Sequence, residues 1–262
     1  MKQLIYKILL SALAVLALSG TVAFLMLGQE RRSRIECSGL VVTVKDSADN
    51  HFVTGRDVQE YIRTGYGKVV GTAVQELKLN RIEEVVTGKS AVLNCEAYIT
   101  PDGVLNLDVT QRRPKVRFQT ASNGWYADAD GFIFPLQRSY TCLVPIVDGE
   151  FPMNPGRGFK GMLEDGKEKD WMKRVVSLVE YMEKTGWDKR ITQIHVDRNG
   201  EITLVPARGC ETFLFGQPDR FPDKFRKMEK YYRMIAPLDR GYAKVDLRYD
   251  SQIVCSEKRN KA

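Results

Sequence analysis

Histidine and paired cysteines are scarce in this sequence, and their scarcity removes several kinds of chemistry. Only two histidines and five cysteines occur among 262 residues, and no two cysteines have the C-x-x-C spacing of zinc and thioredoxin-like motifs. The G-x-S-x-G, H-E-x-x-H and S-x-x-K arrangements of common hydrolases are also missing. We therefore predict no catalytic residue, no metal ligand and no cofactor, although an enzyme assembled from dispersed residues stays open as an alternative.

No long block of one charge is present either. The net charge is +7 and the isoelectric point about 9.1, but the positive charges are spread in small groups along the whole chain. A nucleic-acid arm needs a dense basic run, whereas scattered positive charge is compatible with binding to an acidic protein or an anionic lipid surface. The composition therefore predicts no nucleic-acid partner.

Two short motifs resemble ligand sites but lack the context that such sites need. Residues 156–161 read G-R-G-F-K-G, yet prolines precede them where the dinucleotide fingerprint requires a strand. Asp128-Ala129-Asp130-Gly131 begins like a calcium loop, but Ser139 stands where the bidentate glutamate belongs. We interpret the first as a flexible loop and the second as a tight turn between strands.

The longest apolar run indicates a membrane anchor. Residues 8–27 contain no charge, and 20 helical residues span about 30 Å, the thickness of a bilayer's hydrocarbon core. A cleaved signal peptide is the alternative, but its apolar part is usually about 7–15 residues. We expect a cytoplasmic stub over residues 1–7, a transmembrane helix over 8–28, and the rest of the chain outside the cytoplasm.

Residues 36–113 predict a first small α+β domain with the order β-α-α-β-β. Strands are expected over residues 40–44, 91–99 and 105–109, with two amphipathic helices between the first two strands. Three candidate helix starts have the spacing of a capping box: Thr54 with Asp57, Asn80 with Glu83 and, as an earlier alternative to the second, Thr72 with Gln75. Gly65 and Gly88 are expected to end the two helices. This is the order of a POTRA domain, a non-catalytic module with an exposed strand edge.

Residues 114–255 predict a second domain with a mixed sheet and helices over one of its faces, followed by a polar tail over 256–262. Helices are expected over residues 168–184 and around 225–235, where apolar residues recur at helical spacing. Strands are expected over residues 115–120, 125–128, 132–136, 143–147, 191–196, 201–205 and 212–215, and the segment 242–255 forms one or two more.

The motifs and their order together resemble the FtsQ/DivIB family of bacterial cell-division proteins. The resemblance rests on the short stub and single anchor, the POTRA order, the segments 109–114 (VTQRRP) and 126–131 (YADADG), and Val245-Asp246-Leu247-Arg248-Tyr249 near the end. Gln111 departs from the pattern, because many members have glutamate there. The resemblance covers nearly the whole chain.

The resemblance implies a non-enzymatic, single-pass scaffold of the divisome in the bacterial inner membrane at the division septum, with both domains in the periplasm. Its last strand, carried onto residues 245–254, would bind an FtsB-like protein in complex with an FtsL-like protein, and its POTRA domain would contact other divisome proteins. The implied partner-binding residues are Arg248, Tyr249, Ser251, Gln252 and Ile253. Two alternatives stay open: another POTRA-bearing envelope-assembly or secretion factor, and an anchored extracytoplasmic enzyme.

Overall fold

The computed structural model describes residues 16–21, 35–137, 139–238 and 240–257. The predicted stub and most of the predicted anchor lie outside the described residues; of the anchor only residues 16–21 are described, and they are helical. Within the described ranges, no helix combines the length and the apolar character needed to cross a bilayer. The rest of the chain divides into two units. The first ends at Gln111, and the second comprises Asn50–Phe52 and the residues from Arg112 onward.

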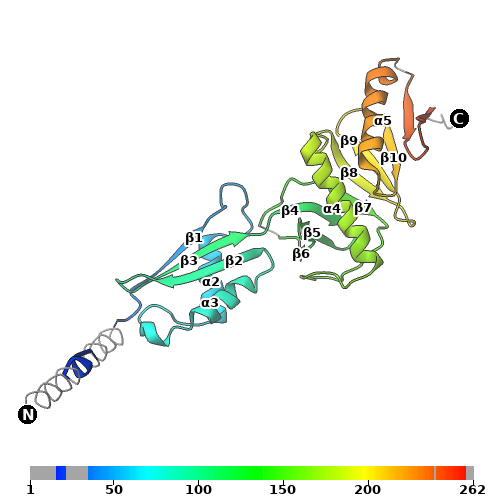
Figure 1. The fold of residues 1–262 in the computed structure, drawn as a ribbon. Helices are drawn as coiled ribbons and strands as arrows, with labels where there is room; N and C mark the ends of the chain where they lie inside the picture. The colour runs from blue at the N-terminus through cyan, green and yellow to red at the C-terminus, as the bar shows by residue number, and fades with distance from the viewer. Residues whose placement is uncertain (1–15, 22–34, 138, 239, 258–262) are drawn as a thin grey trace, which may run out of the picture. The chain divides into compact units, whose positions relative to one another are not determined.

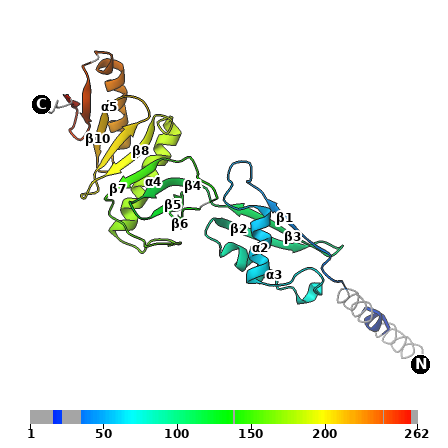
Figure 2. The ribbon, with the colours of Figure 1, turned by 180° about the vertical axis from the view of Figure 1, so that it is seen from behind.

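The first unit is a three-stranded sheet with two helices on one of its faces (Figures 1 and 2). The strands lie in the order β1-β3-β2, with β1 parallel to β3 and β2 antiparallel to it. This arrangement confirms the predicted POTRA-like order, with a short 3-10 turn added before the second helix. The elements are β1 (Gly39–Val44), α2 (Gly55–Gly65), η1 (Val74–Glu76), α3 (Leu79–Thr87), β2 (Val92–Ile99) and β3 (Val104–Gln111).

Local capping explains where α2 begins, but the predicted start of α3 is wrong. The hydroxyl of Thr54 accepts a hydrogen bond from the N–H of Asp57, and the Asp57 carboxylate accepts one from the N–H of Thr54 at 2.8 Å, which completes a capping box. Helix α3 begins after Lys78 without a side-chain cap, so Asn80 lies inside the helix. The glutamate of the expected pair, Glu83, instead accepts a hydrogen bond from the N–H of Ala97 in β2.

Gln111 is a buried polar residue that organises one end of the first unit. Its side-chain oxygen accepts a hydrogen bond from the N–H of Val53 at 2.7 Å, and its backbone N–H donates to the carboxylate of Asp46 at 3.1 Å. The side-chain amide donates to the same carboxylate at 3.3 Å. A neutral amide can donate and accept at once, so it ties two parts of the loop before α2 to the end of β3.

The second unit is a mixed sheet, as predicted, and it has nine strands. Its strands lie in the order β12-β11-β10-β9-β8-β7-β4-β5-β6. Neighbouring strands are antiparallel except for the pairs β4 with β7, β7 with β8 and β10 with β11. The strands are β4 (Pro114–Gln119), β5 (Gly124–Asp128), β6 (Ile133–Pro135), β7 (Ile146–Gly149), β8 (Ile191–Val196), β9 (Ile202–Pro206), β10 (Thr212–Gly216), β11 (Tyr242–Asp246) and β12 (Val254–Glu257).

Two helices cover one face of this sheet, α4 (Lys167–Thr185) and α5 (Phe221–Met234), and the short turn η2 (Ala236–Leu238) follows α5. Figure 1 shows both helices on the same side of the strands. Tyr181 of α4 stacks on Phe225 of α5 with ring centroids 5.4 Å apart, and Phe213 of β10 meets Tyr231 of α5 edge-on at the same separation. Such aromatic contacts add to the burial of apolar area that holds the helices on the sheet.

The Asp-Gly turn and the glycine-rich loop both have the structures predicted for them. The Asp128 carboxylate accepts hydrogen bonds from the N–H groups of Asp130 and Phe132, and Gly131 takes a left-handed φ of 83°. Arg112 donates to the same carboxylate at 2.9 Å and stacks over the Phe132 ring. Residues 156–161 form a loop, and helix α4 begins only after it.

Candidate protein-interaction site

The C-terminal end of the second unit is a hairpin of two strands, and this changes the predicted docking strand. The sequence pattern left one or two strands open over residues 242–255, and the family resemblance implied a single docking strand over 245–254. The structure has two strands: β11 ends at Asp246 and β12 begins at Val254. Strand β11 lies between β10 and β12, so it is inside the sheet. The outer position belongs to β12, and three of its four residues are exposed.

The hydrogen-bond pattern shows which backbone groups of β12 point outward. The N–H of Leu247 donates to the carbonyl of Leu214, so alternate residues of β11, including Val245, direct their backbone groups toward β10. Asp246 and Lys244 then direct theirs toward β12, and their partners there are Val254 and Ser256. Alternation along β12 then directs the backbone groups of Cys255 and Glu257 away from β11. A register shift between Lys244 and Tyr242 places Tyr242 opposite Glu257. Among the described residues, no further strand lies on the outer side of β12.

The five residues implied as partner-binding lie in the loop between β11 and β12, where they have different surroundings. Tyr249 is 52% exposed, and Gln252 is also exposed. Ser251 has a left-handed φ of 59°, an uncommon conformation for a serine. Ile253 packs against the core of the unit. Arg248 is exposed, and its guanidinium also makes ion pairs.

Arg248 joins β11 to the neighbouring turn through two carboxylates. Its guanidinium contacts Asp246 at 2.7 Å and Glu201 at 2.9 Å. Burial acts to raise the pKa of Asp246, but the hydrogen bonds and charge of Arg248 outweigh it and lower that pKa. The hydrogen bond with Asp246 raises the pKa of Arg248, so the guanidinium stays charged. The pair fixes the position at which the chain leaves β11.

Helix α5 holds the same loop from the other side. The Lys227 ammonium donates to the backbone carbonyls of Leu247, at 2.8 Å, and Tyr249. Arg220 makes an ion pair with Asp250. Charged donors to carbonyls are stronger than neutral ones, so these contacts order the loop that leads into β12.

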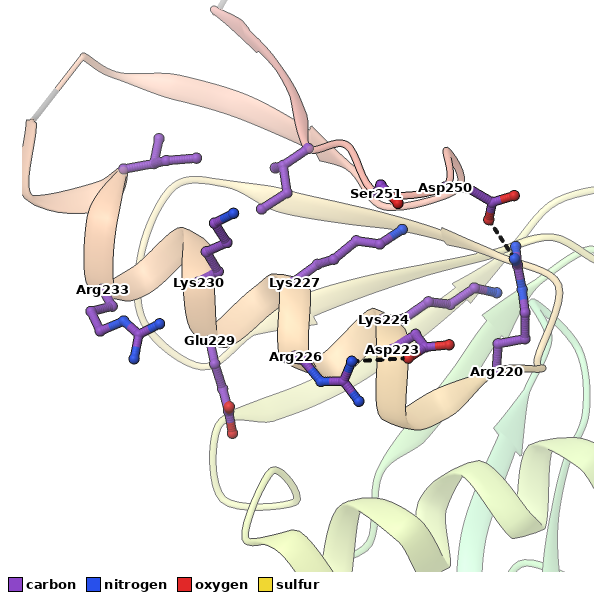
Figure 3. Close-up of a pocket in the computed structure, with 12 residues that line it drawn as sticks. Arg220, Asp223, Lys224, Arg226, Lys227, Glu229, Lys230, Arg233, Asp250 and Ser251 are labelled. Atoms are coloured by element: carbon purple, nitrogen blue, oxygen red, sulfur yellow. Dashed lines mark hydrogen bonds and ion pairs between the residues drawn. The ribbon is translucent and has the colours of Figure 1, made fainter.

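A groove of about 820 Å³ runs between α5 and the residues 250–253. Figure 3 shows Lys224, Lys227 and Lys230 extending from α5 toward the segment that carries Asp250 and Ser251. Six basic side chains and three carboxylates line the groove, so its charge is positive. Residues 250–253 of its wall lead directly into Val254 of β12, so the strand edge and the groove are taken together as one candidate surface.

The sequence predicted an edge strand near the end of the chain but placed it too early, and it missed the groove. The edge strand was expected at residues 245–254, whereas β12 spans Val254–Glu257 and so reaches into the predicted polar tail at 256–262. The groove was missed because the basic residues of α5 were counted only as scattered charge. Their spacing was the available signal, since Lys224, Lys227 and Lys230 recur every third residue and fall on neighbouring positions of a helix.

The second unit also carries a row of polar side chains on strands β7 and β8. His195 contacts the Asp148 carboxylate at 2.9 Å, and Gln193 donates to the same group, so this histidine is one member of a polar row on the face of the sheet away from the helices. Within the described part of the chain, no group of three or more histidine, cysteine or acidic side chains is placed to hold a metal ion.

The fold is a POTRA-like unit followed by a mixed-sheet unit whose edge strand is β12. A POTRA-like domain model matches residues 35–110, and the model described as FtsQ/DivIB, C-terminal related, matches residues 113–256. The second match covers more than half of the chain, and the chain belongs to the FtsQ/DivIB family. Membership associates it with cell division and with septal membrane proteins that are typically non-enzymatic. No curated protein matches the chain significantly.

Proposed function

We propose that this chain is a non-enzymatic, single-pass membrane scaffold of the divisome, which links early and late division proteins at the septum. Residues 8–28 anchor it in the inner membrane, with residues 1–7 in the cytoplasm and both domains in the periplasm. The POTRA domain contacts other divisome proteins. An FtsB-like protein, in complex with an FtsL-like protein, adds a strand to β12.

The open edge of β12 carries this proposal. No strand among the described residues lies on the outer side of Cys255 and Glu257, so their outward N–H and C=O groups favour pairing with another chain, and strand addition satisfies them. Natural proteins usually protect such an edge, so an open one indicates a partner. Tyr249 and Gln252, exposed in the preceding loop, flank the partner strand and contribute side-chain contacts.

The decisive experiment removes an outward donor while leaving the hairpin intact. Glu257→Pro deletes an N–H that points away from the sheet, whereas Glu257→Ala keeps it. We expect the proline variant to bind the FtsB-like partner at least tenfold more weakly, and the alanine variant to bind like wild type. Equal affinities of both variants and wild type would contradict pairing at this edge.

Localisation tests the wider role. A fluorescent fusion of the full chain is expected at midcell in dividing cells. Uniform signal around the envelope would contradict a divisome scaffold. Because Glu257→Pro affects only the β12 edge, its fusion is expected to reach midcell while recruiting less of the FtsB-like partner.

A further inference from the structure

The side chains of two basic residues of the α5 groove, Lys230 and Arg233, have neither an ion pair nor a hydrogen bond with any residue that the structure describes. The neighbouring cations differ from them: Lys227 is bound to the carbonyls of Leu247 and Tyr249, and Lys224 to Gln217 and Asp219. Unneutralised cations in a concave surface raise the local concentration of anions.

The same groove has an apolar side. Ile235 and Ile253 line it, and both are partly buried side chains that pack against the core of the unit. Lys224 is 3% exposed, and burial lowers its pKa, so its chain forms part of the wall. A ligand that fits must combine negative charge with an apolar side chain.

The position of the groove beside β12 indicates what reaches it. Residues 250–253 form one wall, and Val254, the first residue of β12, follows directly. A strand that pairs with the outer edge of β12 and continues past Val254 therefore arrives at the groove. A lipid headgroup has no such continuity with the strand edge.

We propose that the groove between α5 and residues 250–253 binds an acidic, partly apolar segment that adjoins the partner strand on β12. This inference rests on the proposed function, since it assigns a second contact to the same partner. Carboxylates of the segment pair with Lys230 and Arg233, and an apolar side chain packs on Ile235 and Ile253. The strand edge supplies backbone pairing, and the groove supplies the charge and size selection that backbone pairing lacks.

The test uses the full chain in nanodiscs and the periplasmic segment of the FtsB-like partner as the probe, titrated at 50 and 300 mM NaCl. The double variant Lys230→Glu/Arg233→Glu is expected to bind about tenfold more weakly at low salt and to lose most of the salt dependence. Lys173→Glu/Lys184→Glu makes the same charge change at exposed positions of α4 and is expected to bind like wild type. Replacing acidic residues of the probe by lysine is expected to restore binding to the groove variant.

The outcomes separate the groove from the strand edge. Wild-type affinity and salt dependence in Lys230→Glu/Arg233→Glu would overturn the groove assignment. If Glu257→Pro lost binding in the same experiments, the proposal of strand pairing at β12 would still stand. Normal binding by Glu257→Pro would instead contradict strand pairing.

Phosphatidylglycerol vesicles provide the remaining comparison. If wild-type nanodiscs captured them, the groove variant did not, and partner affinity stayed unchanged, the groove would be a lipid site and the proposal would be wrong.

Discussion

The guanidinium of Arg248 folds back on the carboxylate of Asp246, two residues earlier in the chain, with Nη2 2.7 Å from Oδ2 and Nε 3.0 Å from Oδ1. The two-point contact turns the chain at the end of β11, and Nη1 reaches Glu201 on the neighbouring turn. Arg248, which was expected to bind a partner directly, therefore also has a structural role: it positions the loop that leads to the edge strand.

Replacing Asp246 by asparagine is expected to lower the free energy of unfolding at neutral pH by about 1 kcal/mol, a figure reduced because the Arg248 side chain is partly exposed. The pKa of Asp246 is lowered in the folded state, so its stabilising contribution is present above the unfolded value of about 3.9 and is lost as the pH falls through the folded value. The difference between wild type and variant should shrink below about pH 4. Urea unfolding at pH 7 and pH 3 measures this, and a constant difference would contradict the assignment.

Lys227 is expected to control the mobility of the β11–β12 loop. Lys227→Met keeps most of the apolar stem but removes the ammonium that binds the carbonyls of Leu247 and Tyr249. Faster amide hydrogen exchange is expected in residues 248–253, with little change in α4, because the loop loses its fixed donor. Lys184→Met, on the exposed surface of α4, is the matched control. Unchanged exchange in the loop would show that Lys227 does not restrain it.

The regular elements of both units could be predicted from the sequence because local signals determine them. The alternation of β3, with Leu105, Leu107 and Val109 fully buried, comes directly from the two-residue period of a strand. Helix α2 was predicted from Thr54 and Asp57, whose capping contacts lie within one turn. The start of α3 was predicted wrongly because Glu83, the second member of the expected pair, binds the backbone of β2 instead. A tertiary contact replaced a local one.

The candidate site was harder to predict because its parts are distant in the sequence. That β11 is internal depends on its parallel pairing with β10, which lies about 30 residues earlier with α5 in between. No local pattern distinguishes an internal strand from an edge strand of the same length. The groove likewise exists only when α5 packs beside the hairpin loop. The chain order of the motifs was enough for the family, while the exposed edge required the sheet order.

The five cysteines are expected to differ sharply in reactivity. Cys210 is exposed, whereas Cys37 and Cys95 are buried. Burial raises the pKa of Cys95 to about 11, with nearby carboxylates acting in the same direction, so very little thiolate exists at pH 8. Iodoacetamide at pH 8 should therefore modify Cys210 first and reach Cys95 only after denaturation. Peptide mass spectrometry reports each site, and equal rates at Cys210 and Cys95 in the folded protein would contradict the burial.

Gln111 is expected to be the most sensitive polar position in the first unit. Gln111→Leu fits a buried site but leaves the N–H of Val53 without its acceptor and removes a donor from the Asp46 carboxylate. An unsatisfied buried donor costs about 1–3 kcal/mol, so the unfolding free energy of this unit should fall by that amount.

Gln111→Glu separates hydrogen bonding from shape at the same position. The carboxylate still accepts from Val53, but it cannot donate to Asp46, and two buried carboxylates then lie side by side. One of them should keep its proton at a raised pKa, so the variant is expected to be closest to wild type at about pH 4 and to lose stability as the pH rises toward 8. Thermal unfolding of wild type, Gln111→Glu and Gln111→Leu between pH 4 and 8 measures this. A glutamate variant with the pH profile of wild type would show that Asp46 does not need a donor from residue 111.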